Sequence, residues 1–310
     1  MTQKSICSFL NIVNIYNLEY LNKIYVVKSY VEKKSNFKII KQISRPRLLT
    51  FTFNNTISLE KICESEFEFH ENKYKSILKS NLQKSIRRNL PNTALTTAIK
   101  LLQIKGGSLL LLRRLCIIIV EDKLKNIKEI LESYKLLIWI MSSEYGPKGW
   151  KNWILGLIKT ICKFEYLYLD HNKSINIWYN NDYSNYFMIR SYFGGMKGDM
   201  RLLQNVAKYI NESLSEISDE IIIEPIKNIK IIDKINILKS AVDFHCMPNM
   251  LNNIKSKHDE YYLEEIKKAI WIYSSSKRYK VKEVEVNDIW NTIKISVINY
   301  QKYIIDTIET

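Results

Sequence analysis

The chain has 310 residues, of which 46% are hydrophobic and 25% charged, and its formal net charge at pH 7 is +15. This apolar content is enough to bury the core of one large domain or of two ordinary ones. No window of about 18 uninterrupted apolar residues occurs, so a membrane-spanning segment is not expected.

The five cysteines indicate a reducing compartment. They are far apart in the chain and odd in number, which suits free thiols better than a disulfide framework. No small-residue cleavage site follows the weak apolar stretch at residues 6–15, so we expect no signal peptide and an intracellular protein, cytoplasmic or nuclear. No CxxC pair occurs, and the sequence predicts neither a metal site nor a cofactor.

The positive charge favours an acidic partner, most often DNA or RNA. The chain is also rich in Lys, Ile, Asn and Tyr, which an AT-rich genome encodes readily, so codon bias stays open as a source of part of the charge. Arginine is the more informative cation, because its guanidinium grips a phosphate or carboxylate at two points. Only nine of the 47 basic residues are arginine, and six form the close pairs Arg45/Arg47, Arg87/Arg88 and Arg113/Arg114.

Residues 20–53 alternate apolar and polar positions, as strands do. The stretches 24–31 and 37–43 flank a turn at 33–36, and 48–53 follows the break at Arg45-Pro46. We predict a small β-hairpin or three-stranded element there.

From about residue 57 the periodicity becomes helical. One buried helix face is predicted by the three- and four-residue spacing of Tyr74, Ile77, Leu78, Leu82 and Ile86. A second helix begins with Pro91 in its first turn and ends at Gly106-Gly107. Further helices are expected over residues 109–120, 127–141 and 150–168, with a loop at 146–149. The helix at 109–120 is apolar nearly all round and should lie at the centre of the core.

Residues 170–187 have no clear period and predict a long loop or short hairpin, where a domain boundary can fall. Later helices are predicted over residues 199–214, 229–242, 250–257, 261–274 and 289–308, with breaks at Pro225 and Pro248. The fold class is therefore mainly α, a helical bundle or array with a small N-terminal β-element. The parts are residues 1–56, a helical domain at 57–170 and another at 188–310, which can also form one continuous domain with 57–170.

The turn before the predicted helix at 199–214 is the first candidate site. Three of the eight glycines lie within five residues, at Gly194, Gly195 and Gly198. Glycines let backbone N–H groups turn toward one point, next to the positive end of the helix. With Lys197 inside the turn and Arg190 before it, the segment predicts a site for phosphate or a nucleic-acid backbone. It matches neither GxxxxGK[ST] nor GxGxxG, and a tight connection capped by Asp199 is the alternative.

Asp243 and His245, at the end of a predicted helix, form the second candidate. A histidine paired with a carboxylate suits acid–base chemistry. His245 and its neighbour Cys246 diverge too much to act together as base and nucleophile. A buried, hydrogen-bonded histidine at a helix terminus is the alternative.

The arginine pairs are the third group of candidates. Arg113-Arg114 shares the most apolar helix with Glu121-Asp122, so a structural ion-pair network is weighed against a phosphate contact. Arg114 and Glu121 are two turns apart, and joining them requires another helix in between. Arg87-Arg88 closes a helix, where the dipole already favours cations.

One more basic segment surrounds an aromatic residue. Lys277 and Arg278 lie beside Tyr279, and such interleaving can hold a strand by phosphate contact and base stacking. A solvated loop is the alternative.

Three segments between residues 73 and 122 carry a family resemblance. In chain order they are Lys84-Ser85-Ile86-Arg87, Ala94-Leu95 with Ala98, and Arg113-Arg114-Leu115 followed by Glu121-Asp122. They resemble the C-terminal helical region of replication-associated recombination protein A and its Werner-interacting relatives, which are clamp-loader-like AAA+ ATPases. The resemblance implies a helical collar that oligomerises near DNA. The family's phosphate-binding loop and following acidic strand do not occur here, so ATPase activity is not implied.

Three hypotheses of function follow. The leading one is a non-enzymatic basic helical protein that binds DNA or RNA, or an accessory subunit of a replication or transcription complex. Its contact residues would be Arg87, Arg88, Arg113, Arg114, Arg190, Gly194, Gly195, Lys197, Gly198, Lys277 and Arg278. The second is an enzyme acting on nucleic acid or nucleotides that combines the turn at 194–199 with Asp243 and His245. The third is a structural or assembly protein that binds partner proteins or copies of itself.

Overall fold

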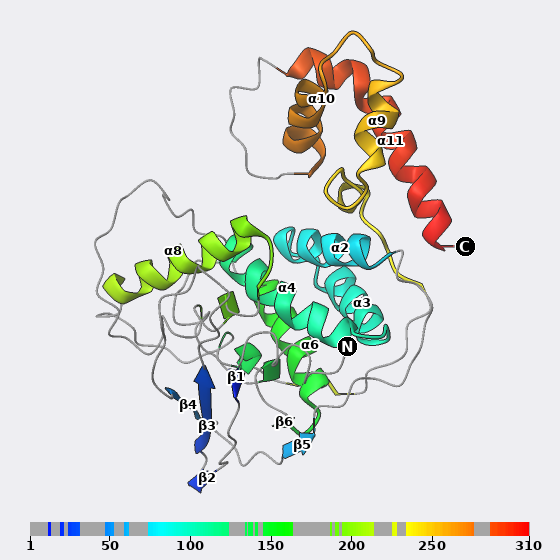
Figure 1. Cartoon of the computed structure of the whole chain (residues 1–310). Coiled ribbons are helices and arrows are strands. Elements are labelled where there is room, and N and C mark those ends of the chain that lie inside the picture. Colours follow the sequence, from blue (N-terminus) through cyan, green and yellow to red (C-terminus); the bar gives the residue numbers. More distant parts are fainter. Residues whose placement is uncertain are drawn as a thin grey trace.

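The secondary structure is mainly helical (Figure 1), which confirms the predicted fold class. The computed structural model describes residues 12–13, 19–21, 24–31, 47–52, 59–61, 74–123, 134, 136–138, 140–141, 145–163, 187, 190–191, 194–213, 225–227, 234–275 and 286–309. Within these ranges, no helix combines the length and the apolar character that crossing a bilayer requires.

Short antiparallel strands come first in the chain. The strands β1 (Ile12–Val13), β2 (Glu19–Leu21) and β4 (Arg47–Thr52) each pair with β3 (Ile24–Val31). In the longest of these pairings, Ile24 lies opposite Thr52. The predicted strand at 37–43 and the turn at 33–36 lie outside the described residues, so the N-terminal β-element as a whole stays a prediction.

Three consecutive helices form the centre of the larger hydrophobic cluster. They are α2 (Lys75–Arg87), α3 (Pro91–Leu102) and α4 (Gly107–Asp122), which pack on one another (Figure 1). The buried side of α2 contains the predicted Ile77, Leu78, Leu82 and Ile86, and Pro91 occupies the first turn of α3 as predicted. Helix α4 buries residues on nearly every side, so its central place in the core is confirmed.

The two glycines between α3 and α4 begin the second helix and do not end the first. Helix α3 stops at Leu102, and α4 starts at Gly107, two residues earlier than predicted. Gly106 has a φ of +70°, a conformation that L side chains rarely adopt. A Cβ on Gly107 would lie 1.7 Å from the carbonyl oxygen of Leu101. The close approach of two backbones, and not helix termination, is therefore what requires glycine here.

Two further helices complete this cluster. Helix α6 (Trp150–Ile161) packs on α3, and α8 (Lys197–Ser213) packs on α4. The end of the helix predicted at 150–168 lies outside the described residues, as does most of the one predicted at 127–141. Buried residues from both sides of the predicted boundary at 170–187, such as Ile161 and Leu203, belong to the same cluster.

Two short stretches differ from their predicted structure near the edge of the core. The strand β5 (Leu59–Lys61) lies where helical structure was expected to begin, and it pairs with β6 (Tyr145–Pro147). The second strand takes up Gly146 and Pro147, which were assigned to a loop. Each strand has only three residues, which is too short for a recognisable alternation of apolar and polar residues. Their pairing joins segments far apart in sequence, so it could not be predicted from local sequence.

The segment at 234–238 is not helical, contrary to the helix predicted over 229–242. Its buried residues alternate, with Ile235 and Ile237 inside and Lys234 and Asn236 exposed. Asn81 of α2 replaces a neighbouring strand: its amide nitrogen donates to the carbonyl of Asn236 at 3.0 Å, and its oxygen accepts from the N–H of Leu238 at 2.9 Å. Only the single turn η3 (Lys239–Ala241) follows.

The C-terminal helices form a second, smaller hydrophobic cluster. It contains α9 (Asn249–Lys255), α10 (Leu263–Ile270), the π-helical turn η4 (Trp271–Ser275) and α11 (Asn287–Glu309). These helices agree closely with those predicted at 250–257, 261–274 and 289–308. Figure 1 shows them grouped apart from α2, α3 and α4. The groups meet where Gln301 donates to the carbonyl of Val242 at 3.1 Å and Tyr74 to that of Thr307 at 3.3 Å.

We expect Asn81→Ala to lower the free energy of unfolding by about 1–3 kcal/mol, because it leaves a buried amide and a carbonyl of the 234–238 segment without partners. Urea denaturation measures this change. Ser76→Ala, at an exposed position of the same helix, is the control and should change stability by less than about 0.5 kcal/mol. Equal effects of the two substitutions would show that Asn81 does not hold the segment.

Candidate anion-binding site

Two arginines from different parts of the chain converge on one carbonyl oxygen at the start of α8. The guanidinium of Arg113, on α4, donates to the carbonyl of Gly194 at 2.9 Å. Arg190 donates to the same oxygen at 3.0 Å, and it also donates twice to the carbonyl of Arg113, at 3.3 and 3.2 Å. The turn that the sequence singled out is therefore bound to the arginine pair of the core helix.

This pair of guanidiniums carries positive charge without an acidic partner. Arg190 is only 2% exposed, yet in the part of the chain that the structure describes, neither Arg190 nor Arg113 has a carboxylate within ion-pair distance. Burial and the neighbouring charge of Arg190 lower the pKa of Arg113. Among the described residues the two guanidiniums donate to carbonyl oxygens, so an anion placed here would relieve their repulsion.

The rim of the turn is open to solvent. Gly195, Met196, Lys197 and Gly198 are all exposed, and Gly194 has a φ of +71° that favours glycine. Helix α8 begins at Lys197, so the first N–H groups of a helix of 17 residues lie at this rim. An ion approaching from solvent would meet Lys197, these N–H groups and the cationic field of the arginines behind them.

Asp199 neutralises the third arginine of the cluster. It lies inside the first turn of α8 and not before it, so it is not the N-cap residue that the alternative prediction required. Its carboxylate is 3.6 Å from the guanidinium of Arg114. Asp199 thus balances Arg114, whereas Arg113 and Arg190 have no carboxylate within ion-pair distance among the described residues.

Gln83 of α2 connects Arg114 to the acidic end of α4. Its oxygen accepts from Arg114, and its nitrogen donates to Glu121 at 2.8 Å and to Asp122 at 2.9 Å. Arg114 and Glu121 are thus joined through another helix, as their two-turn separation required. Gln83 was not predicted as a site residue, although its spacing of four residues from Arg87 places both on one side of α2.

Arg87 belongs to an internal ion-pair network. Its Nε is 2.7 Å from Asp122, whose side chain is fully buried, and its NH2 is 3.5 Å from Glu121. Burial acts to lower the pKa of Arg87, but the charge and hydrogen bond of Asp122, together with the charges of Glu121 and Asp243, raise it. These ion pairs of Arg87 were not predicted, because the sequence offered only the helix dipole as the alternative to a phosphate contact. Arg88 is half-buried and makes no ion pair with a carboxylate in the described ranges.

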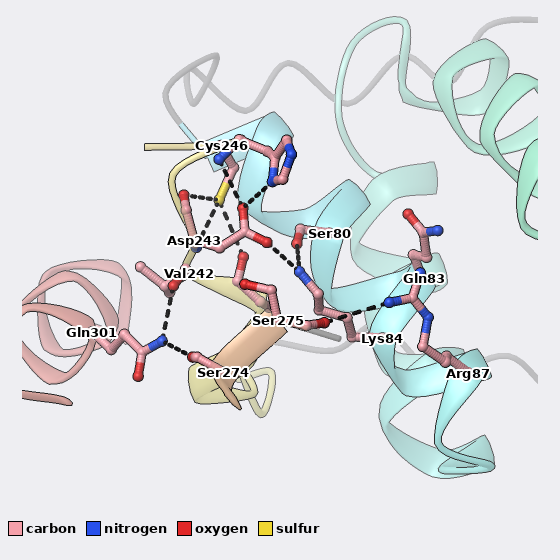
Figure 2. Close-up of polar contacts among 12 residues, drawn as sticks. Ser80, Gln83, Lys84, Arg87, Val242, Asp243, Cys246, Ser274, Ser275 and Gln301 are labelled. Carbon is pink, nitrogen blue, oxygen red and sulfur yellow. Dashed lines mark hydrogen bonds and ion pairs between the residues drawn. The ribbon is translucent and has the colours of Figure 1, made fainter. Parts of the chain in front are cut away.

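The second candidate site is centred on an ion pair between Lys84 and Asp243 (Figure 2). Lys84 also donates to the hydroxyl of Ser80 at 3.2 Å, and Asp243 accepts from the N–H of His245 at 2.9 Å. Burial acts to raise the pKa of Asp243, but the hydrogen bond from His245 and the charge of Lys84 hold it well below its usual range. The carboxylate of Asp243 is therefore ionised and forms an ion pair with Lys84.

His245 and Cys246 take different positions beside this ion pair. The His245 side chain is 54% exposed, with Nδ1 3.5 Å from Asp243, so the buried histidine of the alternative prediction does not occur. The thiol of Cys246 points to the carbonyls of Ala241 and Asp243, at 3.1 and 3.2 Å. Burial raises the pKa of Cys246 to about 11, which leaves it protonated and a poor nucleophile near neutral pH.

The sequence-predicted residues that the structure describes thus fall into three groups. Those brought together at the α8 turn, which we call the anion-binding turn, are Arg113, Arg114, Arg190, Gly194, Gly195, Lys197 and Gly198. Arg87 lies in the internal network with Arg88 beside it, and Asp243 and His245 lie next to Lys84 on α2. Lys277 and Arg278 lie outside the described residues.

No protein-family model matches the chain, and neither curated proteins nor solved structures give a match. The resemblance of residues 73–122 to the clamp-loader-like ATPases stays an expectation from the sequence. The site is therefore interpreted from its own geometry.

We expect Asp243→Asn to lower the free energy of unfolding by about 3–5 kcal/mol near neutral pH, because Lys84 is left buried without its partner. The folded-state pKa of Asp243 is lowered, so its stabilising contribution is complete above the unfolded pKa of about 3.9 and is lost as the pH falls below it. The difference between the wild type and the variant should therefore shrink in urea titrations below about pH 4.

The double variant Lys84→Met/Asp243→Leu provides the control for this experiment. It removes both charges, so it should be closer to wild-type stability than Asp243→Asn. A stability difference between Asp243→Asn and the wild type that stays constant as the pH falls would contradict the ionised pair.

Proposed function

We propose that this chain binds the phosphate backbone of nucleic acid at the anion-binding turn, without catalysing a reaction on it. The observation that supports this proposal is the convergence of Arg113 and Arg190 on the Gly194 carbonyl with no acidic partner among the described residues. Lys197 and the exposed start of α8 add an accessible cation and the first N–H groups of a helix beside them.

The chemistry of the turn suits a phosphate group. Guanidinium groups and helix N-termini both prefer oxyanions, and the hydrogen bonds to Gly194 hold the turn in one shape before any ligand arrives. A site already held in place loses less conformational freedom on binding. Arg201 is exposed one turn further along α8 and extends the positive charge from Lys197.

The remaining arginines support the site from inside the protein. Arg87 and Arg114 use their charge on Asp122, Glu121 and Asp199, which fixes α2, α4 and α8 relative to one another. We therefore propose a smaller contact surface than the full set of arginine pairs. The replication-associated role that the sequence resemblance implies is compatible with this function, and the proposal does not depend on it.

We expect Lys197→Ala to weaken binding to a nucleic-acid strand several-fold and to reduce the slope of log K against log salt by about 1, the value for one lost phosphate contact. Fluorescence anisotropy with a labelled oligonucleotide at several salt concentrations measures both quantities. Because Lys197 is exposed, the substitution should leave the melting temperature unchanged.

Lys159→Ala is the matched control, since Lys159 is an exposed lysine on α6. It should leave both the affinity and the salt slope close to the wild-type values. Binding that is independent of salt, or equal losses in the two variants, would rule out a phosphate contact at the turn.

A further inference from the structure

A half-exposed aromatic cluster lies one helix away from the anion-binding turn. The rings of Phe244 and His245 have centroids 4.2 Å apart and are tilted by 31°. The ring of Trp271, in η4, lies 5.1 Å from His245 in an edge-on arrangement and 6.4 Å from Phe244. Phe244 and Trp271 also pack against the smaller hydrophobic cluster. His245 is thus the most exposed ring of this cluster, and Phe244 and Trp271 support it from the protein side.

The His245 ring is held outward by the turn that carries it. The N–H of His245 donates to Asp243, and Asp243 is fixed in turn by Lys84 of α2 (Figure 2). On the other side of the turn, the Cys246 thiol donates a hydrogen bond to the Ala241 carbonyl. With Phe244 against one face of the imidazole and 54% of the side chain exposed, an outer surface of the ring is free to accept a flat partner. A ring already held in place loses little conformational freedom when it stacks.

Helix α2 links this cluster to the turn. Its Gln83 contacts Arg114, and the adjacent Lys84, which points in a different direction from the helix axis, contacts Asp243. Lys79 lies one turn before Gln83; burial and the charges of Arg114 and Arg113 lower its pKa, and Cys246 is close enough to act in the opposite direction. Lys79 thus adds one cation of α2 that is close to both Arg114 and Cys246. The anion-binding turn and His245 lie on different sides of α2, so a strand that reaches both must pass over this helix.

We infer that the anion-binding turn and the aromatic cluster together bind single-stranded nucleic acid, with phosphates at the turn and one base stacked on His245. The inference rests on the proposed phosphate contact and adds the class of nucleic acid that the site selects. A single strand exposes base faces that an aromatic side chain can cover, whereas the bases of a duplex are stacked on one another. Cations followed by an exposed ring are the two features that such strands require.

The test compares four labelled probes of equal length, about 12 nucleotides, within the range of about 4–16 that single-strand-binding modules cover. They are oligothymidylate, oligouridylate, an abasic phosphate backbone and a DNA duplex.

We expect the full chain to bind the single strands more tightly than the duplex or the abasic backbone. His245→Ala should weaken single-strand binding by about 5- to 150-fold, the range for losing one base stack, and leave abasic binding unchanged. His245→Phe should restore binding, because the ring is what the base contacts. Preference for either single strand over the duplex and the abasic backbone supports the inference.

Tyr262→Ala is the control, because Tyr262 is a 79% exposed aromatic residue at the opposite end of α10 from Trp271. If His245→Ala behaves like Tyr262→Ala, or if the duplex binds as tightly as the single strands, the inference is wrong. The phosphate contact still stands in that case, provided that Lys197→Ala weakens abasic or duplex binding. If no probe shows salt-sensitive binding that depends on Lys197, the proposed function fails and the inference fails with it.

Discussion

The ion pair between Lys84 and Asp243 is the contact on which the arrangement of the helices depends. Lys84 lies on α2 in the larger hydrophobic cluster, and Asp243 lies in the segment that leads to the smaller one. Both side chains are withdrawn from water, so each charge would be costly alone and is tolerated only because the other is present. The pair therefore fixes where the C-terminal helices join the core, together with the hydrogen bond from Gln301 to Val242.

The need of a buried charge for an opposite charge also explains why some arginines have a structural role and others can bind a ligand. Arg87 and Arg114 lie within reach of Asp122, Glu121 and Asp199, and their charges are used inside the protein. Arg113 and Arg190 reach only carbonyl groups among the described residues, and these groups do not neutralise them. Among the described residues, this unpaired positive charge lies at the turn of Gly194, Gly195 and Gly198, most of which is exposed to solvent. We propose a function for this turn because its two arginines are not paired with carboxylates of the described residues.

Helices with a strong local signal could be predicted from the sequence. The spacing of Ile77, Leu82 and Ile86 and the position of Pro91 identified α2 and α3 because helical periodicity and capping act over a few residues. The segment at 234–238 was predicted wrongly because its isoleucines suit either a helix or a strand. Its conformation is decided by Asn81, more than 150 residues earlier in the chain. The candidate turn was likewise found from its glycines, whereas Gln83 and Lys79 gain a role only through the packing of α2.

Composition and local pattern were enough to predict a mainly helical chain with excess positive charge, a few arginine pairs and one glycine-rich turn before a helix. These features are local or compositional, so each can be recognised without knowing what lies opposite it. Which arginines contact carboxylates and which contact carbonyl oxygens depends on how the helices pack. This packing also sets the exposed ring of His245 across α2 from the cationic turn. The physical reason is that electrostatic and stacking interactions act over a few ångströms in space, and the distance between residues along the chain does not limit them.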